Sequence, residues 1–341
     1  MDKKPQFTYV KKNTTTTTNN SNSNNNNHYN NTPKQQGGPK SIPKVLPNPI
    51  DNSLETIDIG ANLADKQFIV DQDDILKRSF EKGVKTIVIT GTSINSSIRA
   101  FDLIRKKKSD VFPELFSTCG VHPHEAEETM KRLNGSDGAI KELRRLIESN
   151  RDIVRAVGEC GLDFNRNFSS HETQIEMFSK QIQLAVDLQL PLFIHERDAH
   201  QKFLEIVGKF TGAGVMPKSV VHCFTGTEQE AKTYIDSGFY LGFTGFVAHK
   251  TRGEELRQII SKGIIPIDKI MIETDAPYMG YFNIHPNDMP PKSAKISKGR
   301  NEPSYLPYIL RTLSECYKLP ELEISIQLLK NTREFFNLIK K

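Results

Sequence analysis

The sequence predicts an α/β fold, a (β/α)8 barrel of the TIM type preceded by a disordered N-terminal tail. Eight short apolar, β-branched runs recur along the chain, and their centres are 21 to 38 residues apart, the length of one strand, turn and helix. Closure into a barrel is favoured over an open sheet because it removes exposed strand edges, and because no Gly-rich phosphate turn follows the first run. The eight runs are Thr56–Gly60, Thr86–Gly91, Leu115–Val121, Ile153–Gly158, Leu192–His195, Ser219–Phe224, Phe239–Phe243 and Lys269–Thr274.

Residues 1–52 are expected to form the disordered tail, and residues 53–341 the barrel domain. The tail contains the threonine run Thr14–Thr18, an Asn/Ser tract and many prolines, so it has too little apolar surface to offset the entropy of ordering. Residues 1–50 contain seven lysines and one aspartate, a net charge of +6, whereas the whole chain carries +5. The remainder therefore carries −1, and net charge alone does not indicate nucleic-acid binding by the barrel.

The stretches between the runs have helical periodicity. In Glu172–Gln189 apolar residues recur every three or four positions and predict a helix with one face on the core. The segment Glu302–Lys341 is expected to form two helices that close the barrel. The basic run Lys106–Lys108 lies on another helical pattern, where a solvated face is a simpler interpretation than a nuclear-import signal.

The chain has neither a long apolar stretch nor an apolar run after its N-terminal lysines, so we expect no membrane span and no secretory signal. Its four cysteines form no CxxC pair and are interpreted as free thiols in a reducing compartment. We therefore expect a monomer in the cytoplasm, the nucleus or both, without a membrane partner.

Ionisable residues stand at the ends of four runs. They are Glu159, His195, His222 and Asp275. Strand side chains alternate between two faces, so each shares a face with the residue two positions earlier. Those earlier residues are Val157, Phe193, Val220 and Glu273. If they face the barrel interior, the four ionisable groups meet at the carboxyl ends of the strands, where barrel active sites lie.

Two histidines and two carboxylates are a ligand set for Mg²⁺, Mn²⁺ or Zn²⁺. Such an ion makes hydroxide available near neutral pH, and Asp275 is the candidate for the base that takes the proton of water. Taken singly, a strand histidine is more often a satisfied core residue, and an aspartate after a strand is often a helix cap. Four strand ends with ligand-type residues at one level favour a metal-dependent hydrolase of unspecified substrate.

Seven segments between residues 56 and 336 match the motifs of a known protein family. They are Asp58–Leu63, Gly120–His124, Gly158–Phe164, His195–Ala199, His222–Gly226, Glu273–Tyr278 and Arg300–Pro303. Together they resemble the TatD family of metal-dependent deoxyribonucleases, within the amidohydrolase-like barrels. The resemblance implies that Glu159, His195, His222 and Asp275 bind one or two divalent ions, with Mg²⁺ favoured, and that Glu159 bridges the ions when two are bound.

The first strand departs from one family pattern. Many members carry Asp-x-His-x-His there, whereas this chain has Gly60 and Asn62 at the two histidine positions. The same replacement is typical of the TatD branch proper, so the resemblance points to the exonuclease branch. It also implies a weaker second metal site, filled together with substrate phosphate.

The resemblance implies hydrolysis of DNA phosphodiester bonds, as a 3′–5′ exonuclease on single strands, with RNA left open as a further substrate. Glu159 and Asp275 are the catalytic candidates, and His124 and Arg197 the substrate-binding ones. For His122 and His124 structural roles stay open, as does an ion pair of Arg197 with Glu196 or Asp198. Two alternative functions remain: hydrolysis of another bond, such as an aminoacyl-tRNA ester, and a non-catalytic metal-binding scaffold.

Overall fold

The computed structural model describes residues 49–280, 284–290 and 299–338. Its eight strands form one sheet in the order β1 to β8, and neighbouring strands are parallel. Beyond β8, Asp275 N donates to Gly60 O at 2.8 Å and Asn62 N donates to Ala276 O at 2.7 Å, which closes the sheet. The predicted barrel is confirmed. The strands are β1 (Thr56–Ala61), β2 (Val84–Ile89), β3 (Glu114–Cys119), β4 (Val154–Asp163), β5 (Leu192–Arg197), β6 (Ser219–Val221), β7 (Tyr240–Phe243) and β8 (Ile270–Ile272).

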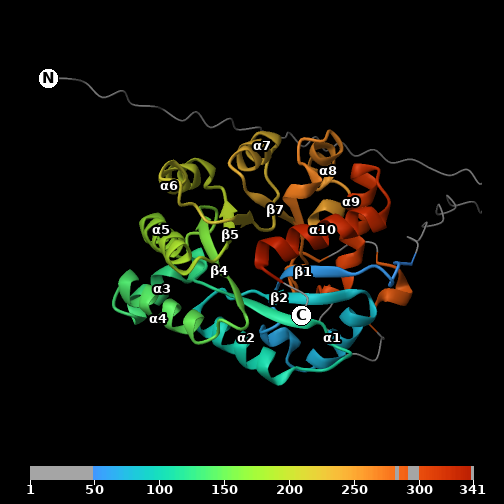
Figure 1. Ribbon diagram of the computed structural model, residues 1–341, viewed down its shortest axis with the longest axis horizontal. Coiled ribbons are helices and arrows are strands. Elements are labelled where there is room, and N and C mark those ends of the chain that lie inside the picture. Colours follow the sequence, from blue (N-terminus) through green and yellow to red (C-terminus); the bar gives the residue numbers. More distant parts are fainter. Residues whose placement is uncertain (1–48, 281–283, 291–298, 339–341) are drawn as a thin grey trace, which may run out of the picture. The chain divides into compact units, whose positions relative to one another are not determined.

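Helices α1 to α9 lie around the outside of the strands, and α10 lies nearer the centre of the view (Figure 1). This arrangement follows from the parallel strands, which need a crossover connection between each pair. The α-helices of the described residues are α1 (Gln72–Glu81), α2 (Ile94–Lys106), α3 (Ala126–Arg132), α4 (Ser136–Glu148), α5 (His171–Leu188), α6 (His200–Gly212), α7 (Glu228–Asp236), α8 (Glu254–Ser261), α9 (Leu306–Tyr317) and α10 (Glu321–Phe336).

The barrel has two cores, one on each face of its sheet. The larger core packs the outer face of the strands against the helices. The smaller core fills the barrel interior and is sealed by Phe335 and Phe336 at the end of α10. Burial on both faces explains why the strands are continuous apolar runs rather than alternating ones. The interior residues from the strands are Ile57, Ile59, Val88, Phe116, Ala156, Phe193, Val220 and Met271.

The helical predictions are confirmed. Helix α5 covers the predicted Glu172–Gln189 to within one residue at each end, and Ser170 caps its start by accepting from Thr173 N. Within its apolar stripe Phe178 and Ile182 are fully buried. The segment after Glu302 forms α9 and α10, as expected.

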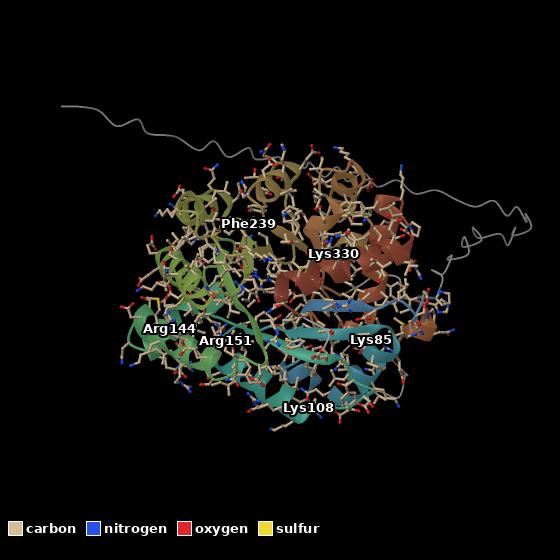
Figure 2. All side chains as sticks on the ribbon, in the orientation of Figure 1. Lys85, Lys108, Arg144, Arg151, Phe239 and Lys330 are labelled. Carbon is tan, nitrogen blue, oxygen red and sulfur yellow. The ribbon has the colours of Figure 1, made fainter. Side chains whose placement is uncertain are left out.

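The N-terminal tail falls almost entirely outside the described residues, which begin at position 49. The packed part already includes Ile50, which is 7% exposed, so the core begins slightly before the predicted domain boundary. Lys106 and Lys108 are exposed, and Lys108 lies at the periphery of the molecule, as expected for a solvated face (Figure 2). The four cysteines are free. In the part of the chain that the structure describes, no helix is long and apolar enough to cross a membrane.

Arg300 and Asn301 connect the described part of the segment before α9 to the barrel mouth. The Arg300 guanidinium, 1% exposed, binds both carboxylate oxygens of Asp71 at 2.8 and 2.6 Å. Asn301 Nδ2 donates to Thr274 O and Tyr278 O, both at 2.7 Å. These contacts hold the segment that carries Asp275 and Tyr278 in one position at the barrel mouth.

Candidate metal centre

A cavity of about 840 Å³ opens at the carboxyl ends of the strands, and each of the eight strands contributes to its lining through its last residues or the segment that follows it. A second hollow, of about 800 Å³, lies at the amino ends of the strands, but no histidine, aspartate or cysteine lines it. The chemistry therefore belongs to the first cavity. The sequence-predicted site residues that line it are His124, Glu159, His195, Arg197, His222 and Asp275.

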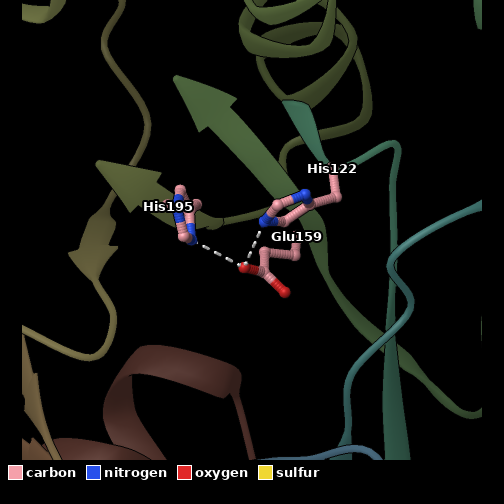
Figure 3. A group of neighbouring side chains, drawn as sticks. All are labelled: His122, Glu159 and His195. Carbon is pink, nitrogen blue, oxygen red and sulfur yellow. Dashed lines mark hydrogen bonds and ion pairs between the residues drawn. The ribbon is translucent and has the colours of Figure 1, made fainter. Parts of the chain in front are cut away.

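Glu159 is the centre of the site. Its Oε1 lies 2.7 Å from His222 Nε2, 3.1 Å from His195 Nδ1 and 3.3 Å from His122 Nε2. Figure 3 shows His122 and His195 pointing towards this carboxylate from different segments of the barrel. Burial alone would raise the pKa of Glu159, but the charges of His222 and His122 and its hydrogen bonds hold that pKa well below its ordinary value. Glu159 is therefore an anion, 5% exposed, among imidazole rings.

Strand β4 reaches this position through an irregularity. Ala156 faces the barrel interior and Val157 faces the helices, so the prediction that Val157 shares the inner face with Glu159 is wrong. Between Gly158 and Cys160 the pairing with β5 slips by one residue, which leaves Glu159 as a bulge aimed at the mouth. Strand β4 also continues to Asp163, five residues beyond the predicted end.

His195 and His222 each lie between two carboxylates. One ring nitrogen of each faces Glu159, while His195 Nε2 lies 3.5 Å from Asp163 Oδ2 and His222 Nδ1 lies 3.4 Å from Glu273 Oε2. Metal-binding histidines commonly have such a carboxylate behind the ring, which fixes the tautomer and leaves the inner nitrogen free for the ion. In the described residues His195 Nε2, His222 Nδ1 and Glu273 Oε2 are buried without a hydrogen bond.

The charge balance of the site also fits a cation. Burial alone would lower the pKa of His222, but Cys223, Glu159 and Glu273 hold it well above its ordinary value. Burial raises the pKa of Asp275 to about 7; the charge of His222 opposes this increase, and the charges of Glu159 and Glu273 add to it. The carboxylates thus outnumber the positive charges that the chain offers them, and a divalent ion would correct this excess.

His122 differs from the other two histidines. Its Nδ1 accepts the backbone N–H of His124 at 3.1 Å, so in the neutral ring the proton is on Nε2. Burial lowers the pKa of His122 to about 4, so the ring is neutral near pH 7. His122 therefore directs its Nε2–H at the Glu159 carboxylate, 3.3 Å away. The sequence left the role of His122 open and favoured His124 as the substrate-binding residue, although His122 directly follows the third apolar run.

The other predicted residues lie around this centre. Asp275 is outside the two groups of potential metal ligands, His122–Glu159–His195 and His222–Cys223–Glu273; its Oδ1 accepts from Asn62 Nδ2 at 2.9 Å. His124 Nε2 is paired with Asp163 Oδ2 at 2.7 Å. Asp275 and His124 both line the cavity.

Arg197 is exposed and forms no ion pair among the described residues. Its two possible partners are engaged elsewhere: Glu196 accepts from Tyr234 Oη at 2.7 Å, and Asp198 accepts from Asn165 Nδ2 at 2.6 Å. The guanidinium is therefore available at the edge of the cavity.

Comparisons with known proteins identify the family to which this chain belongs. The model of the family described as TatD related DNase matches residues 57–337. The chain belongs to this family. It is 42% identical over 257 residues to the 3′-5′ ssDNA/RNA exonuclease TatD of Salmonella typhimurium, and 41% identical over 257 residues to that of Escherichia coli K12. Each alignment covers 75% of this chain and 89% of the relative.

Among solved structures, the chain is similar to a TatD family hydrolase from Entamoeba histolytica, with a TM-score of 0.71 and 30% identity. That match covers 83% of this chain and 98% of the other. It is also similar to a TatD homologue from Escherichia coli K12, with a TM-score of 0.69, 26% identity and the same coverage of both chains. The predicted resemblance to the TatD family is confirmed.

The structure shows what lies beside Gly60, the first of the two TatD-family histidine positions. A Cβ atom at this residue would lie 2.4 Å from Glu273 Oε2, and one at Gly242 would lie 2.5 Å from Glu273 Oε1. Cys223 N donates to the same Oε1 at 2.6 Å. The space beside the first strand is thus occupied by the Glu273 carboxylate, which stands behind His222.

Proposed function

We propose that this protein is a metal-dependent exonuclease that hydrolyses phosphodiester bonds of single-stranded DNA, and of RNA, from the 3′ end. The observation that carries the proposal is the convergence of His195 and His222 on the Glu159 carboxylate at the base of the cavity. The exposed guanidinium of Arg197 lies at the edge of the same cavity. The Salmonella and Escherichia relatives are 3′-5′ ssDNA/RNA exonucleases, which supports both the substrate and the polarity.

We propose Mg²⁺ as the ion, with Mn²⁺ and Zn²⁺ as alternatives that imidazole ligands also suit. Glu159, His195, His222 and Asp275 would hold it, one or two ions per chain. The bound ion supplies Lewis-acid chemistry, which polarises a phosphoryl oxygen and increases the acidity of water. Asp163 and Glu273 lie behind the two rings, in the position from which a carboxylate orients a metal-binding histidine.

The chain's own groups then have separate tasks. Asp275 accepts the proton of the attacking water: Asn62 fixes its Oδ1, and no hydrogen bond to its Oδ2 is present among the described residues. His122 donates its Nε2–H towards a phosphate oxygen, because its Nδ1 is held as an acceptor. Arg197 and His124 bind the phosphate of the substrate strand.

The deciding experiment is hydrolysis of single strands labelled at either end, with Mg²⁺ or Mn²⁺ and then with excess chelator. A 3′–5′ exonuclease releases the 3′ label at once as a mononucleotide and shortens the 5′-labelled strand stepwise. We expect chelation to abolish both signals, added metal to restore them, and Asp275→Ala to remove them. Release of the 5′ label as the first product, or full activity in chelator, would contradict the proposal. Charged tRNA in the same assay tests the ester-hydrolase alternative.

Arg197→Ala should raise the KM for single-stranded DNA about tenfold, a larger factor than the fall in kcat, because a phosphate contact is lost. The slope of log affinity against log salt should fall by about 0.7, the value for one phosphate of a single strand. Arg99→Ala is the matched control, since Arg99 is exposed on α2, away from the cavity. An unchanged KM and salt slope in Arg197→Ala would show that this residue does not bind phosphate.

A further inference from the structure

We propose that the cavity mouth is a stacking site for nucleobases, in which Phe168 and Tyr278 hold the bases of the strand on either side of the scissile phosphate. This inference rests on the proposed function, since it names how the same cavity recognises a single strand. Its starting point is two aromatic rings that remain largely exposed, 65% for Phe168 and 51% for Tyr278.

Phe168 lies on the segment between β4 and α5. Its ring packs edge-on against His124, with 4.8 Å between ring centroids. His124 is itself fixed by Asp163, so this ring is supported at one side and open to solvent elsewhere. An exposed phenyl ring beside a catalytic cavity gains free energy when a flat apolar partner covers it.

Tyr278 lies on the segment after β8 and lines the cavity. Its backbone is held at both ends: its N donates to Asp275 O at 2.9 Å, and its O accepts from Asn301 Nδ2 at 2.7 Å. Its hydroxyl donates to Asp65 Oδ2 at 3.3 Å. The ring is therefore fixed before any ligand binds, which reduces the entropy cost of stacking.

The two rings flank the metal ligands. Strands β4 and β8 are four positions apart in a closed ring of eight, so the segments that follow them lie on opposite sides of the mouth. The metal ligands come from one side of this ring of strands: Glu159 from β4, His195 from β5 and His222 from the segment after β6. A strand that crosses the mouth would place a phosphate over Glu159 and a base over each ring. Stacking of this kind needs unpaired bases and tolerates any base.

Three arginines are positioned to bind the phosphates of such a strand. Arg166 after β4, Arg197 at the end of β5 and Arg252 after β7 line the cavity, and all are exposed. None has an ion-pair partner within the described ranges; Arg252 lies over the Phe246 ring, 5.7 Å from its centroid. The mouth thus combines unpaired positive charge with open aromatic faces, the two components of sequence-tolerant single-strand binding.

The test compares two fluorescent single strands of equal length, one with ordinary nucleotides and one with abasic sites at its 3′ end. Both keep every phosphate, so they differ only in the bases. Binding is measured with Mg²⁺ present and Asp275→Asn as the parent, which suppresses hydrolysis. Phe168→Ala and Tyr278→Ala should each weaken binding of the ordinary strand roughly 5- to 150-fold and that of the abasic strand less than about twofold.

Phe168→Tyr and Tyr278→Phe keep a stacking face and should bind like the parent. Leu322→Ala is a control for loss of an exposed apolar side chain away from the mouth, since Leu322 is 57% exposed on α10. Equal losses on both strands, or no loss on either, overturn the stacking site. Nucleotide release by the otherwise unaltered chain is measured separately. If nucleotide release is absent while the alanine variants still discriminate between the two strands, the exonuclease proposal fails and the stacking site stands. If nucleotides are released but the alanine variants do not discriminate, the stacking site fails and the exonuclease proposal stands.

Discussion

Glu159→Gln should reduce nuclease activity at least about a thousandfold and abolish tight metal binding. The amide keeps the shape of the side chain but removes the negative charge that His122, His195 and His222 surround. The histidines would then face an uncharged group, and the ion would lose the ligand common to all of them. Titration of Mn²⁺ binding by calorimetry, together with kcat on labelled single strands, measures both effects.

Glu125→Gln is the matched control, because Glu125 lines the same cavity but is outside both groups of potential metal ligands. It should bind Mn²⁺ as the unaltered chain does. Retention of tight metal binding by Glu159→Gln would show that Glu159 is not the central metal ligand.

Gly161→Ala should destabilise the fold by about 3 kcal/mol or more. Gly161 has φ +141°, a backbone conformation open essentially to glycine alone, and a Cβ atom would lie 1.9 Å from His195 O. The contact is with the backbone of β5, so no side-chain rotation relieves it. Because Gly161 lies between Glu159 and Asp163, any accommodation would also move the metal ligands. Guanidinium unfolding measures the loss.

The same substitution elsewhere should have the opposite sign. Gly208 is an exposed position in α6, and a Cβ atom added there would have no other atom within 4 Å. Gly208→Ala should therefore stabilise the fold by about 0.5–1 kcal/mol. If both variants changed the free energy of unfolding by less than about 0.5 kcal/mol, the close approach of β4 to β5 would have no energetic significance.

The fold was predictable because each barrel strand is buried on both faces and appears in the sequence as a compact apolar run. The end of β4 was not. Gly158 and Gly161 resemble strand terminators in a sequence, yet here they permit contact with β5, and the strand continues to Asp163. Whether a glycine ends a strand or allows a close approach depends on the neighbouring strand, which a local pattern does not contain.

The site was predictable where a ligand-type side chain stands at a strand end. This rule found Glu159, His195 and His222, which do meet. It could not assign Glu273. The Glu273 carboxylate reaches its position behind His222 only because Gly60 and Gly242 have no side chains there. Arg252 lies in a loop beyond β7, where no strand or helix period indicates the direction of a side chain.

The surplus of carboxylates around the histidines has a consequence for folding thermodynamics. Glu159, Asp163, Glu273 and Asp275 lie close together at the end of the barrel, and an ion that binds only the folded chain shifts the unfolding equilibrium by mass action. At a hundredfold excess over its dissociation constant the shift is about 2.7 kcal/mol. The melting temperature should therefore rise with Mn²⁺ concentration in this protein and stay constant in Glu159→Gln. The melting temperature then reports how much of the metal site is occupied, and this measurement needs no substrate.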